Sequence, residues 1–335
     1  MQKYNIAILG CGAIFGRHLS AIMANKDSYN LVGLFDPIPE LKNKYAKELN
    51  VKGYNNENDV YLDESVNCIA ILSPSYLHYK QAENAIKNKK NIILEKPATF
   101  SINDLKKLEI LAKENGVEVF CILQVRLNPA VIIAKIAREK GVLGNIRSVS
   151  LIQRWQRPVD YFSGWRGEMA TGGGVLREFA IHYLDAMQFI IGKTPAVTGA
   201  NFFNNKFKNT DVHDSIYSLF NFGSFGGSME ISIAAEPKNL ECTLSIMCDN
   251  GFVKLGGKSL DEIVNSDFLD PNTTDQFEQI RKDVESQKVA TLASLGASPY
   301  HPELYRQILL DQKRFSIEQT YNVIELIEKI YSYSK

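Results

Sequence analysis

The stretch that decides the fold is residues 4–13, Tyr-Asn-Ile-Ala-Ile-Leu-Gly-Cys-Gly-Ala. Six mostly apolar residues form a short strand pattern, and Gly10-Cys11-Gly12 follows directly. Apolar residues then recur at helical spacing over residues 17–24. A strand, a glycine turn and a helix in this order bring backbone N–H groups and the positive end of the helix to a pyrophosphate. The stretch therefore predicts the first unit of a dinucleotide-binding domain.

Strand and helix patterns continue to alternate up to residue 122. Strands are predicted over residues 5–9, 29–35, 66–72, 91–94 and 117–123, and helices over 17–24, 38–49, 78–88 and 102–115. This alternation predicts a parallel, doubly wound sheet. Asp36 closes the second strand, where a carboxylate accepts the ribose hydroxyls of NAD and repels the 2′-phosphate of NADP. We therefore expect NAD, with NADP less favoured; the alternative is a glycine turn that serves packing and an Asp36 that caps its strand.

The pattern changes after residue 122, because strands now cluster. They are predicted over residues 146–155, 197–203, 215–222, 227–234, 240–248 and 252–255, with helices over 130–139 and 175–191 and near 303–313 and 317–332. Clustered strands predict a large open sheet that is mostly antiparallel. We therefore expect an α/β protein of two domains, which are a doubly wound domain over residues 1–122 and an α/β domain over residues 123–335.

Composition narrows the class of protein. The chain has 335 residues, of which 45% are hydrophobic and 23% charged, as is typical of globular proteins. Lys plus Arg and Asp plus Glu both total 38, so nothing favours nucleic-acid or membrane partners. Neither a secretory signal nor an apolar run of about 18 residues is present. Five cysteines without CxxC spacing predict no metal site and no disulfide, so we expect a cytoplasmic protein that acts on small molecules.

Two segments carry the residue types of acid–base chemistry. Glu95-Lys96-Pro97 directly follows a predicted strand, so the Lys96 ammonium is expected at the ligand edge of the sheet. Three glycines, residues 172–174, precede a helix that carries Glu178 and His182 at a spacing of four, on one face. A neutral His182 can accept a hydroxyl proton, with Glu178 or the nearby Asp185 orienting the ring. The alternatives are a solvent-facing lysine and a core histidine held by a carboxylate.

The second predicted domain also contains a stretch rich in arginine. Five arginines and no lysine lie between Arg147 and Arg177, and guanidinium groups suit phosphate and carboxylate ligands. Trp155 and residues 161–165 add flat surfaces that suit a sugar or a nucleobase. The expected substrate-binding residues are Arg126, Asn128, Arg157, Trp165, Arg166, His182 and Asp185. An ordinary solvated strand with aromatic packing is the alternative, and we adopt it for Arg147.

Taken together, these motifs resemble the Gfo/Idh/MocA oxidoreductase family. The resemblance rests on Gly10-x-Gly12, Asp36, Ser73-Pro74 with His78, Glu95-Lys96-Pro97, and the glycine run followed by His182 and Asp185. It implies an N-terminal Rossmann domain and a C-terminal domain whose open sheet forms a homodimer or homotetramer. It also implies Lys96, His182 and Glu178 as catalytic residues, although Glu178 stands where the family has aspartate and Ser73 where it usually has threonine. The implied cofactor-binding residues are Gly10, Gly12, Ala13, Ile14, Asp36, Ser73, Pro74, His78, Glu95, Lys96 and Gln124.

The resemblance also suggests a reaction. Trp165-Arg166-Gly167 and Arg126-x-Asn128-Pro129 are similar to family members that oxidise nucleotide-linked sugars, notably at C3 of UDP-N-acetylglucosaminuronic acid. We therefore expect NAD-dependent oxidation of a sugar hydroxyl to a ketone, or the reverse reduction. An inositol or free-monosaccharide dehydrogenase is the alternative, and a non-catalytic NAD-binding sensor or scaffold is the alternative of another class.

Overall fold

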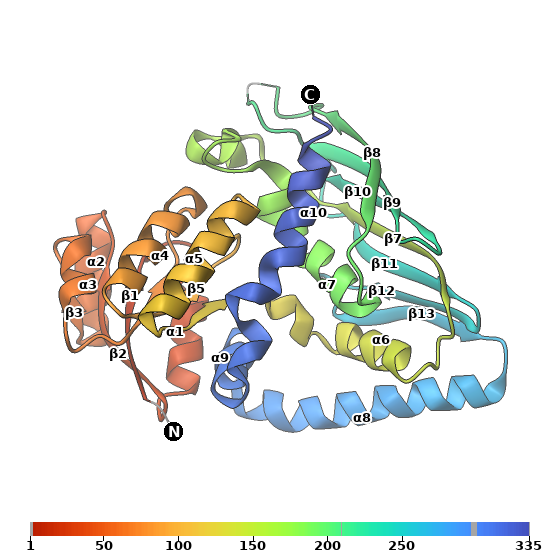
Figure 1. Ribbon diagram of the computed structural model, residues 1–335, viewed down its shortest axis with the longest axis horizontal. Helices are drawn as coiled ribbons and strands as arrows, with labels where there is room; N and C mark the ends of the chain where they lie inside the picture. The colour runs from red at the N-terminus through yellow and green to blue at the C-terminus, as the bar shows by residue number, and fades with distance from the viewer. Residues whose placement is uncertain (1–2, 209, 296–299, 335) are drawn as a thin grey trace. The chain divides into compact units, whose positions relative to one another are not determined.

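The computed structural model describes residues 3–208, 210–295 and 300–334 and divides the chain into two compact units (Figure 1). The first unit comprises Met1–Ile122 and Leu295–Tyr321, and the second comprises Leu123–Ser294 and Asn322–Lys335. The sequence predicted a second domain that runs unbroken from residue 123 to 335. Its segment Leu295–Tyr321 belongs to the first unit instead, because the helix α9 (Tyr300–Leu310) packs against α1 (Phe15–Ala24) and buries Tyr305 in that unit's core.

The first unit contains the predicted parallel sheet. Its six strands lie in the order β3-β2-β1-β4-β5-β6, and every pair is parallel. The strands are β1 (Tyr4–Leu9), β2 (Tyr29–Phe35), β3 (Lys52–Gly53), β4 (Cys68–Ile71), β5 (Asn91–Leu94) and β6 (Val119–Cys121). The remaining helices are α2 (Pro39–Leu49), α3 (Glu57–Leu62), α4 (His78–Lys87) and α5 (Ile102–Asn115). Strands β4 and β5 read as continuous apolar runs because they are buried on both faces.

The second unit contains the predicted open sheet. Its seven strands lie in the order β13-β12-β11-β7-β10-β9-β8, and only the β7–β10 pair is parallel. They are β7 (Ile146–Arg154), β8 (Ala196–Phe203), β9 (Ser215–Asn221), β10 (Gly226–Ser232), β11 (Glu241–Cys248), β12 (Gly251–Gly256) and β13 (Glu262–Phe268). The helices are α6 (Pro129–Glu139), α7 (Ile181–Ile191), α8 (Pro271–Leu295) and α10 (Tyr321–Tyr331). The sequence had not predicted β13 and α8, nor β3 and α3 of the first unit.

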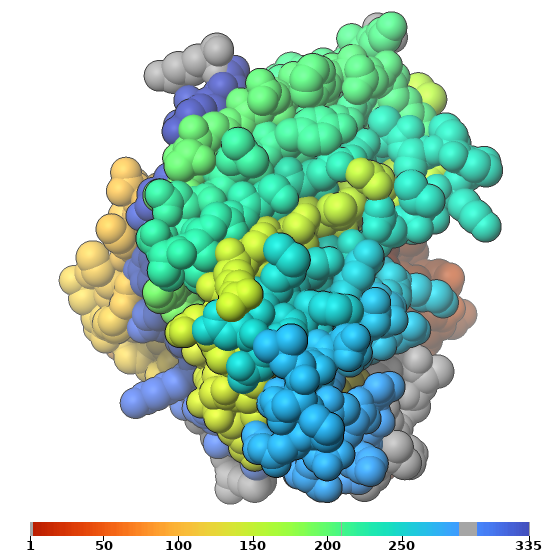
Figure 2. All heavy atoms as spheres, turned by 90° about the vertical axis from the view of Figure 1, so that its right-hand side faces the viewer, coloured from red at the N-terminus to blue at the C-terminus, as the bar shows by residue number. Residues whose placement is uncertain are grey.

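The two faces of this sheet differ. Along β7, Val149, Leu151 and Gln153 are buried, and Ser150 and Arg154 alternate with them on the opposite face. Helices α6 and α7 lie against one face of the sheet (Figure 1). Figure 2 looks onto the other face, where β7 forms a yellow band across the middle of the open face. All five cysteines are free and buried, as small hydrophobic residues usually are. Among the described helices, none combines the length and the apolar character that crossing a bilayer requires.

Candidate active site

The carboxyl ends of the central strands of the first unit lie side by side. The register pairs Leu9 with both Phe35 and Ile71, and Ile71 with Leu94. The residues that follow these strands are therefore neighbours at one edge of the sheet: Gly10, Asp36, Leu72, Ser73, Glu95 and Lys96. Ligands of open parallel sheets bind outside this edge.

The glycine turn is closed on one side and open on the other. Gly10 has φ +101°, and a Cβ there would lie 3.0 Å from the Leu72 carbonyl and from the Ser73 nitrogen, so only glycine fits. A Cβ on Gly12 would have no neighbour within 4 Å, and Ala13 beside it is exposed. Tight backbone packing beneath an open turn is what a bound pyrophosphate needs, so the turn fits the phosphates of NAD.

Two neighbours of the turn differ in what they offer a ligand. Asp36 Oδ2 accepts a hydrogen bond from the Cys11 backbone at 2.7 Å, and Oδ1 accepts one from Ile38 at 2.8 Å. A carboxylate has about four acceptor positions, so Asp36 keeps capacity for two ribose hydroxyls. Phe15 is buried, and its ring centre lies 4.5 Å from that of Tyr45 of α2 in a tilted arrangement. It therefore packs the first helix rather than the open side of the turn.

His78 joins two loops at the edge. Its Nδ1 lies 2.7 Å from the Pro97 carbonyl oxygen and its Nε2 lies 2.9 Å from the Ser73 carbonyl oxygen. The side chain is 1% exposed, and burial lowers its pKa. The sequence analysis expected His78 to bind the cofactor. In the structure both ring nitrogens face backbone carbonyls, so His78 positions the Ser73-Pro74 and Glu95-Lys96-Pro97 segments instead.

Glu95 also faces the interior of the first unit. Its Oε2 accepts the Lys96 backbone N–H at 3.0 Å, and its Oε1 lies 2.9 Å from His18 Nε2. Burial would raise the Glu95 pKa, but the hydrogen bond to His18 and the nearby imidazole of His301 hold it well below its usual value. Glu95 is thus an ionised buried carboxylate that fixes the backbone beside Lys96, and His18 and His301 are partners that the sequence analysis missed.

Arg126 and Asp185 form a buried ion pair in the second unit. Arg126 Nε donates to Asp185 Oδ2 at 2.8 Å and Nη2 donates to Oδ1 at 2.6 Å, with side chains 8% and 4% exposed. Asp185 was expected to orient His182, but the structure shows both of its oxygens bound to Arg126. Asn128 is also bound within the protein, because its side-chain amide donates a hydrogen bond to the Ser259 carbonyl oxygen at 2.7 Å. Gln124 begins a short helix, Gln124–Leu127, and is half-buried.

A group of aromatic and arginine side chains, which we call the aromatic–arginine cluster, gathers Trp155, Arg157, Tyr161, Arg166 and Phe179. The Arg157 guanidinium lies 4.7 Å from the Phe179 ring centre, 4.9 Å from Trp155 and 5.7 Å from Tyr161. Arg166 lies 5.3 Å from the Tyr161 ring and 4.5 Å from that of Trp165. No carboxylate of the described residues forms an ion pair with Arg157. The cluster therefore presents a stacked cation whose charge no neighbouring carboxylate balances.

Glu178 joins this cluster through the turn that begins the helix of His182. The Tyr161 hydroxyl donates to Glu178 Oε1 at 2.8 Å, and Arg166 Nε lies 3.6 Å from the same oxygen. Burial and the charge of Glu178 raise the Tyr161 pKa, so the hydroxyl stays protonated and donates. The sequence analysis expected one regular α-helix here. Leu176–Ala180 is instead a π-helical turn that leads into α7, a feature common at functional sites.

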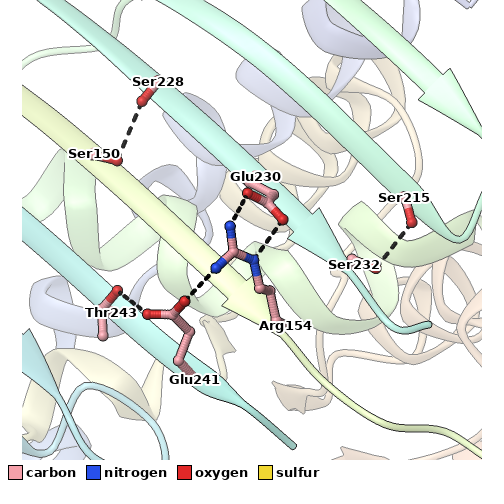
Figure 3. Close-up of polar contacts among 8 residues, drawn as sticks. All are labelled: Ser150, Arg154, Ser215, Ser228, Glu230, Ser232, Glu241 and Thr243. Carbon is pink, nitrogen blue, oxygen red and sulfur yellow. Dashed lines mark hydrogen bonds and ion pairs between the residues drawn. The ribbon is translucent and has the colours of Figure 1, made fainter. Parts of the chain in front are cut away.

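Two other arginines of the predicted stretch, Arg147 and Arg154, lie on β7. Arg154 donates to both Glu230 oxygens, at 2.6 and 2.5 Å, and to Glu241 at 2.6 Å (Figure 3). Arg147 is exposed and pairs with Asp249 at 2.8 Å, in line with the solvated role expected for it. Carboxylates already balance both guanidinium groups. The arginine-rich stretch is therefore divided between β7, the cluster and the π-helical turn, where the Arg177 guanidinium lies 5.2 Å from the Tyr331 ring centre.

Lys96 and His182 belong to different units, so their meeting in one crevice stays a prediction. Each is half-buried. Lys96 follows the carboxyl end of β5, and His182 is the second residue of α7.

Comparison with known proteins covers both units. The family model described as "Oxidoreductase family, NAD-binding Rossmann fold" matches residues 4–122, and "GFO/IDH/MocA C-terminal domain" matches residues 132–254. The chain is 28% identical over 192 residues to 2,7-anhydro-N-acetylneuraminate hydratase of Escherichia coli K12, covering 57% of this chain and 50% of that protein. It is 25% identical over 239 residues to scyllo-inositol 2-dehydrogenase (NAD(+)) of Bacillus subtilis 168, covering 67% and 66%.

A solved structure resembles the whole chain. The WlbA dehydrogenase of Bordetella pertussis, in complex with NADH and UDP-GlcNAcA, superposes with a TM-score of 0.87 at 23% identity, covering 99% of this chain and 96% of that one. That likeness concerns the fold. The aligned regions span 50% to 62% of the length of three curated relatives. Because its two family models together match most of the sequence, the chain belongs to the Gfo/Idh/MocA family of NAD-dependent oxidoreductases.

Proposed function

We propose that this protein is an NAD-dependent dehydrogenase that oxidises a ring hydroxyl of a nucleotide-linked sugar to a ketone, or reduces that ketone. The observation that carries the proposal is the register of the first sheet. It aligns the open glycine turn, Asp36 and the Glu95-Lys96 segment at one edge. The residues proposed to recognise the cofactor are therefore neighbours of Lys96, whose ammonium group suits a substrate oxygen.

The chain's own residues divide the work as follows. Gly10 and Gly12 hold the pyrophosphate of NAD, and Asp36 accepts hydrogen bonds from the ribose. NAD, when bound, supplies the acceptor for the substrate's hydride. His182 takes the proton of the substrate hydroxyl, and Lys96 stabilises the negative charge that develops on that oxygen. Glu178, held by Tyr161 and Arg166, keeps a negative charge on the π-helical turn that precedes His182.

The aromatic–arginine cluster supports the substrate class. A nucleotide-linked sugar carries phosphate groups and a flat base, and a stacked guanidinium without a carboxylate partner suits either of them. The fold shared with the WlbA dehydrogenase is consistent with this choice. An inositol or a free sugar carries neither group and leaves Arg157 without a charged ligand.

The experiment identifies small molecules that copurify with the protein by mass spectrometry and then assays the matching sugars for NADH formation. UDP-linked uronic acids, free monosaccharides and inositols form the panel, and product masses are recorded in parallel. Loss of two hydrogens with stoichiometric NADH is expected. A product heavier by one water without net NADH would favour the hydratase chemistry named for one relative. Tight NAD binding without any product would support a sensor.

Asp36→Asn tests the cofactor assignment separately. The amide keeps the size of the side chain but loses the charge that repels a 2′-phosphate. We expect weaker NAD binding and a gain in NADP relative to NAD. If the ratio of the two affinities were unchanged, Asp36 would not face the ribose.

A further inference from the structure

Three side chains that the proposed reaction does not use meet inside the first unit. His18 comes from α1, Glu95 from the end of β5 and His301 from α9. They are 0%, 7% and 2% exposed. Each offers one ligand atom, and these three atoms lie within 4.8 Å of one another. Two imidazoles and a carboxylate are a donor set that zinc uses in proteins.

The spacing of the donors suits a metal ion. His18 Nε2 lies 2.9 Å and His301 Nε2 lies 3.6 Å from Glu95 Oε1. Zinc bonds to nitrogen and oxygen are about 2.0–2.2 Å long, so tetrahedral donors lie roughly 3.3 Å apart. The two observed separations bracket that value, so shifts of a few tenths of an ångström would bring both pairs to the spacing of metal ligands. At 3.6 Å the His301–Glu95 separation is too long for a hydrogen bond, and His301 Nε2 has no hydrogen-bond partner although it is buried.

A polar group behind His18 also resembles the partners that orient histidine ligands in metal sites. His18 Nδ1, on the far side of its ring, lies 2.8 Å from the Tyr305 hydroxyl. That hydroxyl oxygen can accept a hydrogen bond from Nδ1–H, and in this tautomer the Nε2 lone pair is available for a metal. A polar group of this kind behind a histidine ligand fixes the ring and its tautomer. A hydrogen-bonded pair of His18 and Glu95 alone would explain neither the orphaned His301 nitrogen nor its aim at the same oxygen.

We propose that His18, Glu95 and His301 form a binding site for one divalent transition-metal ion, Zn²⁺ by preference. The ion joins α1, β5 and α9, and so fastens the late segment Leu295–Tyr321 to the N-terminal sheet of the same unit. Because Glu95 Oε2 accepts the Lys96 N–H, the ion also fixes the backbone beside Lys96. The role is structural, since the donors are too buried for substrate to reach them. This site lies within the first unit and does not depend on which reaction the protein catalyses.

The test measures metal binding in the full-length protein. Protein stripped with a chelator is titrated with Zn²⁺ by calorimetry, and Co²⁺ is added separately to record the visible absorption of a tetrahedral site. We expect one ion per chain and a Tm that rises by several degrees once free Zn²⁺ exceeds Kd about 100-fold. His301→Ala is expected to weaken Zn²⁺ binding by more than about 100-fold, since even outer-shell changes cost 10–100-fold.

Two further variants show whether a loss of Zn²⁺ binding is specific to this site. Tyr305→Phe removes only the outer-shell hydroxyl and is expected to weaken Zn²⁺ binding about 10-fold. His213→Gln changes a histidine of the second unit and should leave Zn²⁺ binding unaltered. Absence of stoichiometric binding in the unaltered protein would overturn the proposal without a variant having to fold. Equal binding by His301→Ala and the unaltered protein would overturn it too, because the ion would then lie elsewhere.

Discussion

The arginines of the second unit differ in whether a carboxylate pairs with their guanidinium group. Arg126 and Arg154 are each held by carboxylates, Arg126 in the interior by Asp185 and Arg154 on the open sheet face by Glu230 and Glu241. Arg157 instead stacks among aromatic rings without a carboxylate partner among the described residues. Residue type alone does not separate these roles. What separates them is whether a carboxylate of the protein itself balances the charge.

In the proposed function the ligand binds beside the aromatic–arginine cluster, and the largest effect is expected from the helix that adjoins this cluster. Replacing the proposed base, His182→Asn, should lower kcat by about 10²–10⁴-fold, because proton transfer from the hydroxyl loses its acceptor. NAD affinity should change little. Stopped-flow or steady-state NADH formation measures the first quantity and calorimetry the second.

His213→Asn is the matched control, since His213 lies in the same unit and packs against Phe202. Its turnover should equal that of the unaltered protein. Full activity of His182→Asn would remove the base from the mechanism and shift the chemistry away from the cluster.

The next effect is on the free energy of unfolding, and it tests the buried ion pair of Arg126 and Asp185. Arg126→Met leaves the Asp185 carboxylate buried without its partner, which should cost about 3–5 kcal/mol in the free energy of unfolding. The double variant Arg126→Met, Asp185→Leu should recover most of that loss, because paired removal leaves no orphan charge. Urea-induced unfolding measures both. A single variant that lost less than about 1 kcal/mol would mean that water or another group already compensates Asp185.

Local patterns predicted the first unit well. The glycine turn, Asp36 and the Glu95-Lys96 segment follow short buried strands, and the register places them at one edge as expected. The helix α8 also has a local signal in the sequence. Asp270 accepts the Thr273 N–H as an N-cap, Pro271 opens the helix, and Phe277, Ile280 and Val284 form its buried stripe.

Other features had no local signal. β13 reads Glu-Ile-Val-Asn-Ser-Asp-Phe and is a mostly polar edge strand, so only its pairing with β12 identifies it. The π-helical turn of Glu178 follows a tightly packed glycine, since a Cβ on Gly174 would lie 2.6 Å from the Tyr331 hydroxyl. The meeting of His18, Glu95 and His301 likewise requires α9 to return to the first unit. Cysteine spacing could not indicate such a site.

A smaller effect is expected when Arg157 is replaced by lysine, which keeps the positive charge but lacks the planar guanidinium group. Arg157→Lys should raise KM for a nucleotide-linked substrate by about 2- to 30-fold, the range of a cation–π contact, and leave kcat nearly unchanged. Arg147→Lys is the control, because Arg147 is exposed on the sheet and pairs with Asp249. An unchanged KM in Arg157→Lys would show that the cluster packs the fold and does not recognise the ligand.

The smallest effect is expected at the open sheet face. Arg154 is 35% exposed and its partners Glu230 and Glu241 are 20% and 25% exposed, so solvent screens the pairs. In the isolated chain, Arg154→Met should therefore cost no more than about 1 kcal/mol in the free energy of unfolding and leave kcat unaltered. A loss as large as that of Arg126→Met would show that the open face is covered in solution. If the loss also grew with protein concentration, a second copy of the chain would be the cover, because only association makes stability depend on concentration.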